Sequence, residues 1–167
     1  MMDAASRQKV LNQIADMVID KADDTISTLT RVCGSPIEVM LGACLIWHSK
    51  LWWSGDSLIL ETQERLTDWS PQVTHFLVPQ YSTGGHRFDF LLRDGAFEVF
   101  IECDGHAFHE QTKRQAERDR RIDRDIQGPG RRLLRFTGSE INRDPMACAE
   151  SVFIFIDKLY TPIEARG

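Results

Sequence analysis

Two runs of alternating apolar and polar residues flank Asp94-Gly95 near the middle of the chain. Asp-Gly between two such runs is a strong signal for a β-hairpin with a two-residue turn. With this dipeptide as the turn, Asp89 on the first strand lies opposite Phe100 on the second. The pattern therefore predicts an antiparallel hairpin over residues 86–104.

The two faces of this predicted hairpin differ in chemistry. Side chains alternate along a strand, so one face receives only apolar residues and builds a core. The other face receives three acids, Asp89, Glu102 and Asp104. Leu91 and Phe100 share that face, so it is not fully hydrated. Like charges at this spacing repel one another, which favours a cation among them over a merely solvated surface.

Helical signals precede and follow the hairpin. Apolar spacing predicts a helix within the first 31 residues, ended by Cys33-Gly34. Ser35 is then expected to cap a second helix, with Pro36 in its first position. The other predicted elements are the continuation of that helix to about Trp52, a strand over 72–81, an Arg-rich helix over 110–126, a strand over 131–136 and a helix from Pro145 to about Tyr160.

This order of elements predicts an α/β fold in which a small mixed sheet with an antiparallel hairpin is flanked by helices. A length of 167 residues fits one domain with a sizeable core. We divide it into an N-terminal helical extension (1–34), a core (35–142) and a C-terminal helix (143–167).

Composition adds an expectation about location. The first residues lack the apolar segment of a secretory signal, and the longest apolar run, Val39 to Trp47, is too short to span a bilayer. The four cysteines are scattered without paired spacing, which favours reduced thiols. We therefore expect a cytoplasmic protein without membrane contact.

Charge is distributed unevenly along the chain. The formal net charge is −5, yet residues 113–135 hold nine of the 20 Lys and Arg residues and only four of the 25 acids. A basic excess in an otherwise acidic protein is typical of a phosphate-binding surface. Pairing within the helix, as between Glu117 and Arg121, is the alternative interpretation. The residues that we expect to bind DNA are Lys113, Arg114, Arg118 and Arg121.

The acids resemble those of the PD-(D/E)XK nuclease superfamily, which has the restriction-endonuclease-like fold. Asp89 matches its first hairpin acid and Glu102 its second. The run IECDGHAFH, residues 101–109, resembles the very-short-patch-repair-like (EVDG-type) endonucleases. Those families place a glycine and then a histidine after the hairpin acids, here Gly105 and His109.

Further matches lie outside this run. Glu38 fits a glutamate that those families carry near the start of a preceding helix, and Arg135-Phe136 fits the end of a later strand. The resemblance covers about residues 35–142 and implies a restriction-endonuclease-like core. Glu38 also lies three residues after Ser35, so it can equally close a capping box.

The resemblance implies a Mg²⁺-dependent endonuclease that hydrolyses DNA, with Mn²⁺ as a possible substitute. Asp89, Glu102 and Asp104 would hold the ion, since carboxylates are the ligands that Mg²⁺ prefers. Glu38 would assist at the metal. His109 would act as general acid or base, because imidazole transfers protons near neutral pH.

The chain departs from the superfamily at Asp104, where a lysine is usual. EVDG-type relatives share this acid, and His109 or Lys113 is a candidate for the lysine's role. Two alternatives stay open. One is a nucleic-acid-binding module that no longer cleaves. The other is a structural zinc site formed by Cys103, Asp104, His106 and His109, although Cys103 is expected on the face opposite Asp104. We expect DNA as the partner, and the sequence leaves open a homodimer.

Overall fold

The computed structural model describes the backbone of residues 8–9, 12, 21–53, 58–68, 75–104, 113–126 and 128–160. The side chains of 113–116 and 118–119 lie outside the described set. Five strands form a mixed sheet in the order β1-β2-β5-β6-β7. Their bounds are β1 Ile59–Leu60, β2 His75–Pro79, β5 Phe90–Asp94, β6 Phe97–Asp104 and β7 Arg131–Thr137. A separate two-stranded sheet pairs β3 (Ser82–Thr83) with β4 (His86–Arg87).

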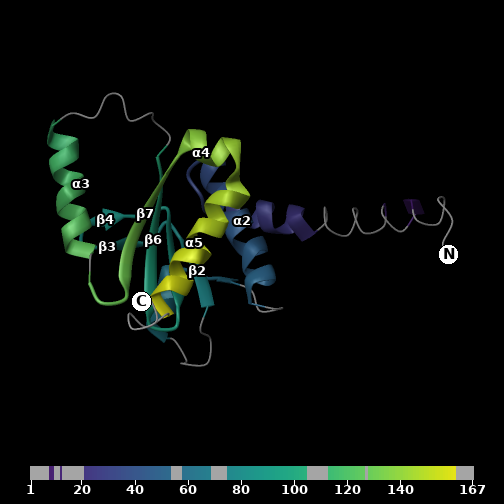
Figure 1. Ribbon diagram of the computed structural model, residues 1–167, viewed down its shortest axis with the longest axis horizontal. Coiled ribbons are helices and arrows are strands. Elements are labelled where there is room, and N and C mark those ends of the chain that lie inside the picture. The colour runs from purple at the N-terminus through teal and green to yellow at the C-terminus, as the bar shows by residue number, and fades with distance from the viewer. Residues whose placement is uncertain are drawn as a thin grey trace, which may run out of the picture.

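Helices cover both faces of the larger sheet (Figure 1), which confirms the predicted mixed α/β class. Helices α2, α4 and α5 pack on one face, and α3 packs on the other with the β3–β4 hairpin. Their bounds are α2 Pro36–Trp52, α3 Lys113–Ile126, α4 Gly138–Arg143 and α5 Pro145–Tyr160. Residues 21–30 are also helical, and Gln63–Asp68 form a 3₁₀ helix.

The larger core lies between the sheet and α2, α4 and α5. Phe90 and Ile101 point into it from the hairpin, as the alternation predicts. Gly42 lets α2 approach closely, because a Cβ at that position would stand 2.9 Å from Cζ of Phe90. Burial of these apolar side chains fixes α2, and with it Glu38, against the strand that follows Asp89.

The turn of the β5–β6 hairpin lies one residue later than predicted. Asp94 pairs with Phe97, so the two turn residues are Gly95 and Ala96. Gly95 has a φ of 56°, a left-handed conformation that glycine adopts without a steric penalty. The first residue of this turn therefore needs glycine, and Asp94 closes the strand instead of entering the turn.

This change shifts the strand register by two residues. Phe90 pairs with Ile101, and the same register continued by one residue places Asp89 across from Glu102. The prediction that Asp89 faces Phe100 is therefore wrong. Because side chains alternate with a period of two, a shift by two keeps those of β5 and β6 on their predicted faces.

The first strand of the hairpin is shorter than predicted. β5 begins only at Phe90, and the residues before it belong to β4. Gly84 and Gly85, both with positive φ, make the turn between β3 and β4. Because the chain bends between β4 and β5, Phe88 packs against Phe100 with 4.9 Å between ring centroids. Phe88 thus lies on the α3 side, not in the larger core as predicted.

The other predicted elements are confirmed where the structure describes them. Ser35 caps α2 by accepting the Glu38 backbone N–H, and Pro36 takes the first helical position. Missed elements are β1, the 3₁₀ helix, β3 and α4, which are shorter than the windows over which periodicity can be read. None of the described helices is long and apolar enough to cross a membrane.

Candidate functional site

Four of the predicted site acids converge at one end of the larger sheet. Asp89 directly precedes β5, Glu102 and Asp104 end β6, and Glu38 lies in the first turn of α2. Glu38, Glu102 and Asp104 all raise the pKa of Asp89 through their negative charge. The structure therefore brings together, from three separate segments, the acids that the sequence assigned to one site.

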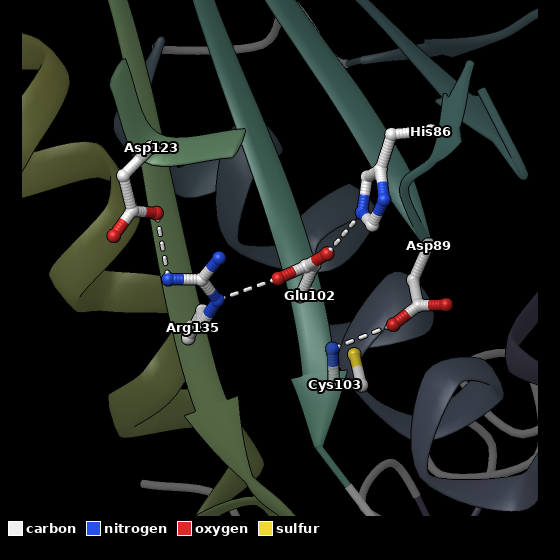
Figure 2. A network of polar contacts seen from close by, with 6 residues as sticks. All are labelled: His86, Asp89, Glu102, Cys103, Asp123 and Arg135. Atoms are coloured by element: carbon white, nitrogen blue, oxygen red, sulfur yellow. Dashed lines mark hydrogen bonds and ion pairs between the residues drawn. The ribbon is translucent and has the colours of Figure 1, made fainter. Parts of the chain in front are cut away.

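Asp89 lies at the centre of this group and is half-buried. Its Oδ2 accepts a hydrogen bond from the backbone N–H of Cys103 at 2.6 Å (Figure 2). Burial raises the pKa of Asp89 most, the Cys103 bond lowers it, and the three neighbouring acids raise it further, to about 6. The charged form of this side chain is thus held in an unfavourable environment, which a cation would relieve.

Glu102 lies between two basic side chains (Figure 2). Nε2 of His86 lies 2.5 Å from its Oε1, and Nε of Arg135 donates to its Oε2 at 2.6 Å. Arg135 is the register partner of Glu102 in the parallel β6–β7 pair, so the two side chains leave the sheet side by side. Both carboxylate oxygens of Glu102 therefore already have a partner from the protein.

Arg135 connects the sheet to α3. Its Nη1 donates to Asp123 of α3 at 2.8 Å, in addition to the bond from Nε to Glu102. Burial lowers the pKa of Arg135, but the bonds to both acids more than offset this and raise it. The remaining nitrogen, Nη2, is buried and has no hydrogen-bond partner among the described residues. A buried donor without a partner is costly, so this nitrogen is suited to an incoming oxygen.

Glu38 is buried, with 7% of its surface exposed, and serves as a helix cap. Its carboxylate accepts hydrogen bonds from the Gly34 N–H, the Ser35 hydroxyl and the Gln80 side-chain amide, at 2.7–2.8 Å. The backbone donor is Gly34, not the N-cap residue itself as in the usual capping box. The capping interpretation is supported, and the same bonds fix Glu38 beside Asp89.

Gln80 is a site residue that the sequence gave no reason to select. Its φ of 54° is left-handed, which is uncommon for a residue other than glycine. Its backbone N–H donates to the Asp89 carbonyl at 2.8 Å, and its side-chain amide reaches Glu38. Such backbone strain concentrates at functional sites, and here it joins two of the acids.

His86 and Arg135 were also missed as partners of Glu102. Arg135 lies in a strand that the sequence did predict, but the register that aligns it with Glu102 joins residues 33 positions apart. His86 reaches Glu102 because β4 leaves the hairpin plane as a separate strand. A predicted strand rich in arginine beside one that carries acids is the signal that would have indicated Arg135.

Several predicted residues fall beyond the described part. His106 and His109 lie outside the described residues, and so do the side chains of Lys113, Arg114 and Arg118. Arg121 is described and exposed on α3, and it forms no ion pair with another described side chain. The alternative pair Glu117–Arg121 is therefore absent.

The chemistry of the acids fits a magnesium ion, although their present arrangement does not yet form a metal cage. Among the described residues, no three His, Cys, Asp or Glu side chains are placed to hold an ion. Mg²⁺ keeps several waters and takes only one or two carboxylates, so Asp89 with Glu102 or Asp104 is a sufficient donor set. Glu102 would have to share or release His86 or Arg135.

The zinc alternative is weakened at Cys103. Burial raises the pKa of this thiol well above its usual range, and the charge of Asp89 adds to the effect. Zinc binds the thiolate form of cysteine. A buried thiol beside several carboxylates is therefore a poor start for a structural zinc site.

Asp89→Asn should stabilise the protein near neutral pH. The pKa of Asp89 is about 6 in the folded chain, against 3.8 for an unperturbed aspartate, which represents the unfolded chain. As pH rises between these values, the unfolded chain loses the proton first, so the free energy of unfolding falls. Asparagine still accepts the Cys103 bond without carrying charge. Allowing for partial exposure, we expect a gain of roughly 1–2 kcal/mol above that range and none below about pH 4. Urea unfolding across pH measures it, and a gain independent of pH would contradict the assignment.

Comparison with known proteins gives no further guide. A scan against protein-family models, a search of curated proteins and a search of solved structures each found no match. What this chain does must therefore be argued from the acids, Arg135 and their surroundings.

Proposed function

We propose that this chain is a metal-dependent DNA endonuclease. The observation that carries the proposal is the convergence of Glu38, Asp89, Glu102 and Asp104 beside Arg135 at one end of the sheet. When bound, Mg²⁺ would activate a water molecule and stabilise charge on the cleaved phosphate. Acids held this close, at the expense of mutual repulsion, are explained by a cation that belongs among them.

The side chains take distinct roles under this proposal. Asp89 and Glu102 hold the ion, and Asp104 is a further ligand. Glu38, fixed by its helix cap and by Gln80, orients water at the ion. His109 gives or takes the proton, as the resemblance to very-short-patch-repair-like endonucleases implies.

Arg135 is suited to the role of the lysine that the superfamily usually carries. It is anchored at Nε and Nη1, which leaves Nη2 as the donor for a phosphate oxygen. A guanidinium held by two carboxylates loses little freedom when it binds a third oxygen, and its charge is permanent. His86 holds the other oxygen of Glu102 and so fixes the orientation of that carboxylate.

DNA is the proposed substrate because a basic helix borders the acids. Helix α3 lies next to β7, the strand that carries Arg135, and Asp123 joins the two (Figure 1). Arg120, Arg121 and Arg124 are exposed on this helix. A duplex that follows α3 would therefore bring its backbone close to Arg135 and the acids beside it.

A DNA-binding module that has lost cleavage is the second candidate. It is favoured by the absence of the lysine and by the engagement of both Glu102 oxygens. Both candidates bind DNA, so cleavage by the unmodified protein distinguishes them.

The acids should be essential for cleavage. We expect Asp89→Asn and Glu102→Gln each to slow nicking of supercoiled plasmid by at least about a hundredfold while the protein stays folded, because each removes a ligand of the ion. Mg²⁺ should raise the melting temperature of the unmodified protein but not of Asp89→Asn. The matched control is Glu98→Gln, an acid four residues earlier on β6 that pairs with Arg131. Equal rates in all variants, or no nicking with Mg²⁺ or Mn²⁺, would count against a nuclease.

Arg135 should matter for turnover more than for binding. Arg135→Lys keeps the charge but cannot reach Glu102, Asp123 and a phosphate together, so we expect a loss of about 10–100-fold in kcat. Arg132→Lys on the same strand is the control, since Arg132 is exposed and, within the described part of the chain, bonds only to backbone carbonyls. Single-turnover nicking rates and DNA affinity are measured for both. A loss confined to affinity would show that Arg135 only holds DNA.

The basic helix should control binding and its dependence on salt. Changing Arg114, Arg118 and Arg121 together to Gln should lower DNA affinity and flatten the plot of log affinity against log salt by up to about 3 units. Asp89→Asn should bind DNA as well as the parent does. Fluorescence anisotropy with a labelled duplex measures both quantities. An unchanged slope in the triple variant would place the DNA path elsewhere.

A further inference from the structure

The helix formed by residues 21–30 has little contact with the rest of the described chain. It extends beyond α2, away from the sheet (Figure 1). Leu29 is its only buried side chain and packs in the larger core. Ile26, three residues earlier, is 43% exposed. The core therefore covers the last turn of this helix and leaves the apolar face before it open.

Ile26 continues an apolar stripe that the sequence predicts for the preceding residues. Helical spacing places on one face the side chains of Val10, Ile14, Met17, Val18 and Ala22. Of these five, only Ala22 belongs to the described residues. With Ile26 they form what we call the N-terminal stripe, which leads outward from the core contact of Leu29.

The described residues on either side of this segment are helical. Gln8, Lys9 and Asn12 are helical and exposed, and the Gln8 side chain donates to Oδ1 of Asn12 at 2.9 Å. The four-residue separation of that bond is typical of one helical turn. Thr25, half-buried beside Ile26, donates its hydroxyl to the Lys21 carbonyl at 3.1 Å. Its hydroxyl is therefore already bonded and would not lose a partner if this face were covered.

Charge along this segment is divided into two blocks. Residues 7–13 carry two cations and no acid, whereas residues 16–24 carry four acids and one cation. Lys9, Asp23 and Asp24 are exposed and form no ion pair with another described side chain. Two copies of the segment side by side in parallel would place acid against acid. Two antiparallel copies would place the cations of each against the acids of the other.

We propose that the N-terminal stripe pairs antiparallel with the same stripe of a second copy of this chain. A helix with an apolar face is stable in water only when that face is covered by another element. The charge blocks select a second copy, because the same segment turned around supplies the complementary charges. An antiparallel pair of identical helices has two-fold symmetry, so one segment supplies both sides of the interface.

The same charges disfavour a lipid surface as the occupant. Helices that lie on anionic membranes carry lysine and arginine on the polar face. Here the polar residues from 16 to 24 have an excess of acids. The pairing also does not depend on the nuclease proposed above, since no residue of the candidate site takes part in it.

Sedimentation velocity on the full chain, over a range of concentrations, tests the pairing. We expect a dimer that dissociates on dilution. Val18→Asp with Ile26→Asp should raise its dissociation constant by at least about a hundredfold, because both changes put a charge into the covered face. Ser27→Asp is the matched control, since it adds the same charge at an exposed position on the opposite side of the helix. Ile26 lies outside the core, so these variants should unfold at the temperature of the parent.

Exchange of charges tests the direction. Asp20→Lys with Asp24→Lys would set cations against cations in an antiparallel pair, so we expect the dimer to weaken by about tenfold or more at low salt. Adding Arg7→Glu and Lys9→Glu should restore it. In a parallel pair, the first exchange would only replace repulsion between acids with repulsion between cations and would leave the affinity unchanged.

Two results would overturn the inference. A parent that is monomeric at every concentration would mean that the stripe folds onto its own chain or stays uncovered. A dimer with the same dissociation constant in the parent, in the Val18→Asp and Ile26→Asp variant and in Ser27→Asp would place the interface elsewhere. A dimer that loses affinity in the stripe variant but not on exchange of charges would overturn the antiparallel direction.

Discussion

Repulsion among four carboxylates at one end of the sheet is the constraint on which the arrangement of this protein depends. Three of these acids are held by donors from different parts of the chain: Asp89 by a strand amide, Glu38 by a helix start, and Glu102 by Arg135 and His86. Removing any of these donors would leave a partly buried carboxylate without a hydrogen bond that stabilises its negative charge. The loops, the strained Gln80 and the close approach of α2 all serve to keep the acids together.

Alternation along β6 was sufficient to predict that Glu102 and Asp104 share a face. The predicted register was wrong by two residues, yet the face assignment of Glu102 and Asp104 survived, because a period of two is unaffected by such a shift. The cap at Ser35 and the approximate bounds of α2, β7 and α5 followed from local rules in the same way. Local patterns thus predicted the longer elements and the faces of β5 and β6, but not the register between the strands.

Contacts between distant segments could not be predicted from such patterns. Arg135 meets Glu102 because β7 joins β6 in parallel, and one residue of slippage would have pointed it away from Glu102. His86 depends on the bend that separates β4 from β5, and no alternation marks a bend. Gln80 reaches Glu38 across 42 positions. Each of these contacts depends on how the whole chain packs, which cannot be predicted from the periodicity of single segments.

The double engagement of Arg135 has a consequence for how the two halves of the site communicate. Its guanidinium bonds to Glu102 on the sheet and to Asp123 on α3, so a change at one acid alters the hold on the other. If a cation bound at the acids draws Glu102 away, Arg135 keeps its bond to Asp123 of α3 and gains a free donor for the proposed substrate. Under the proposed function, thermodynamic reciprocity then requires that a ligand which repositions α3 and a cation at the acids change each other's affinity by the same factor.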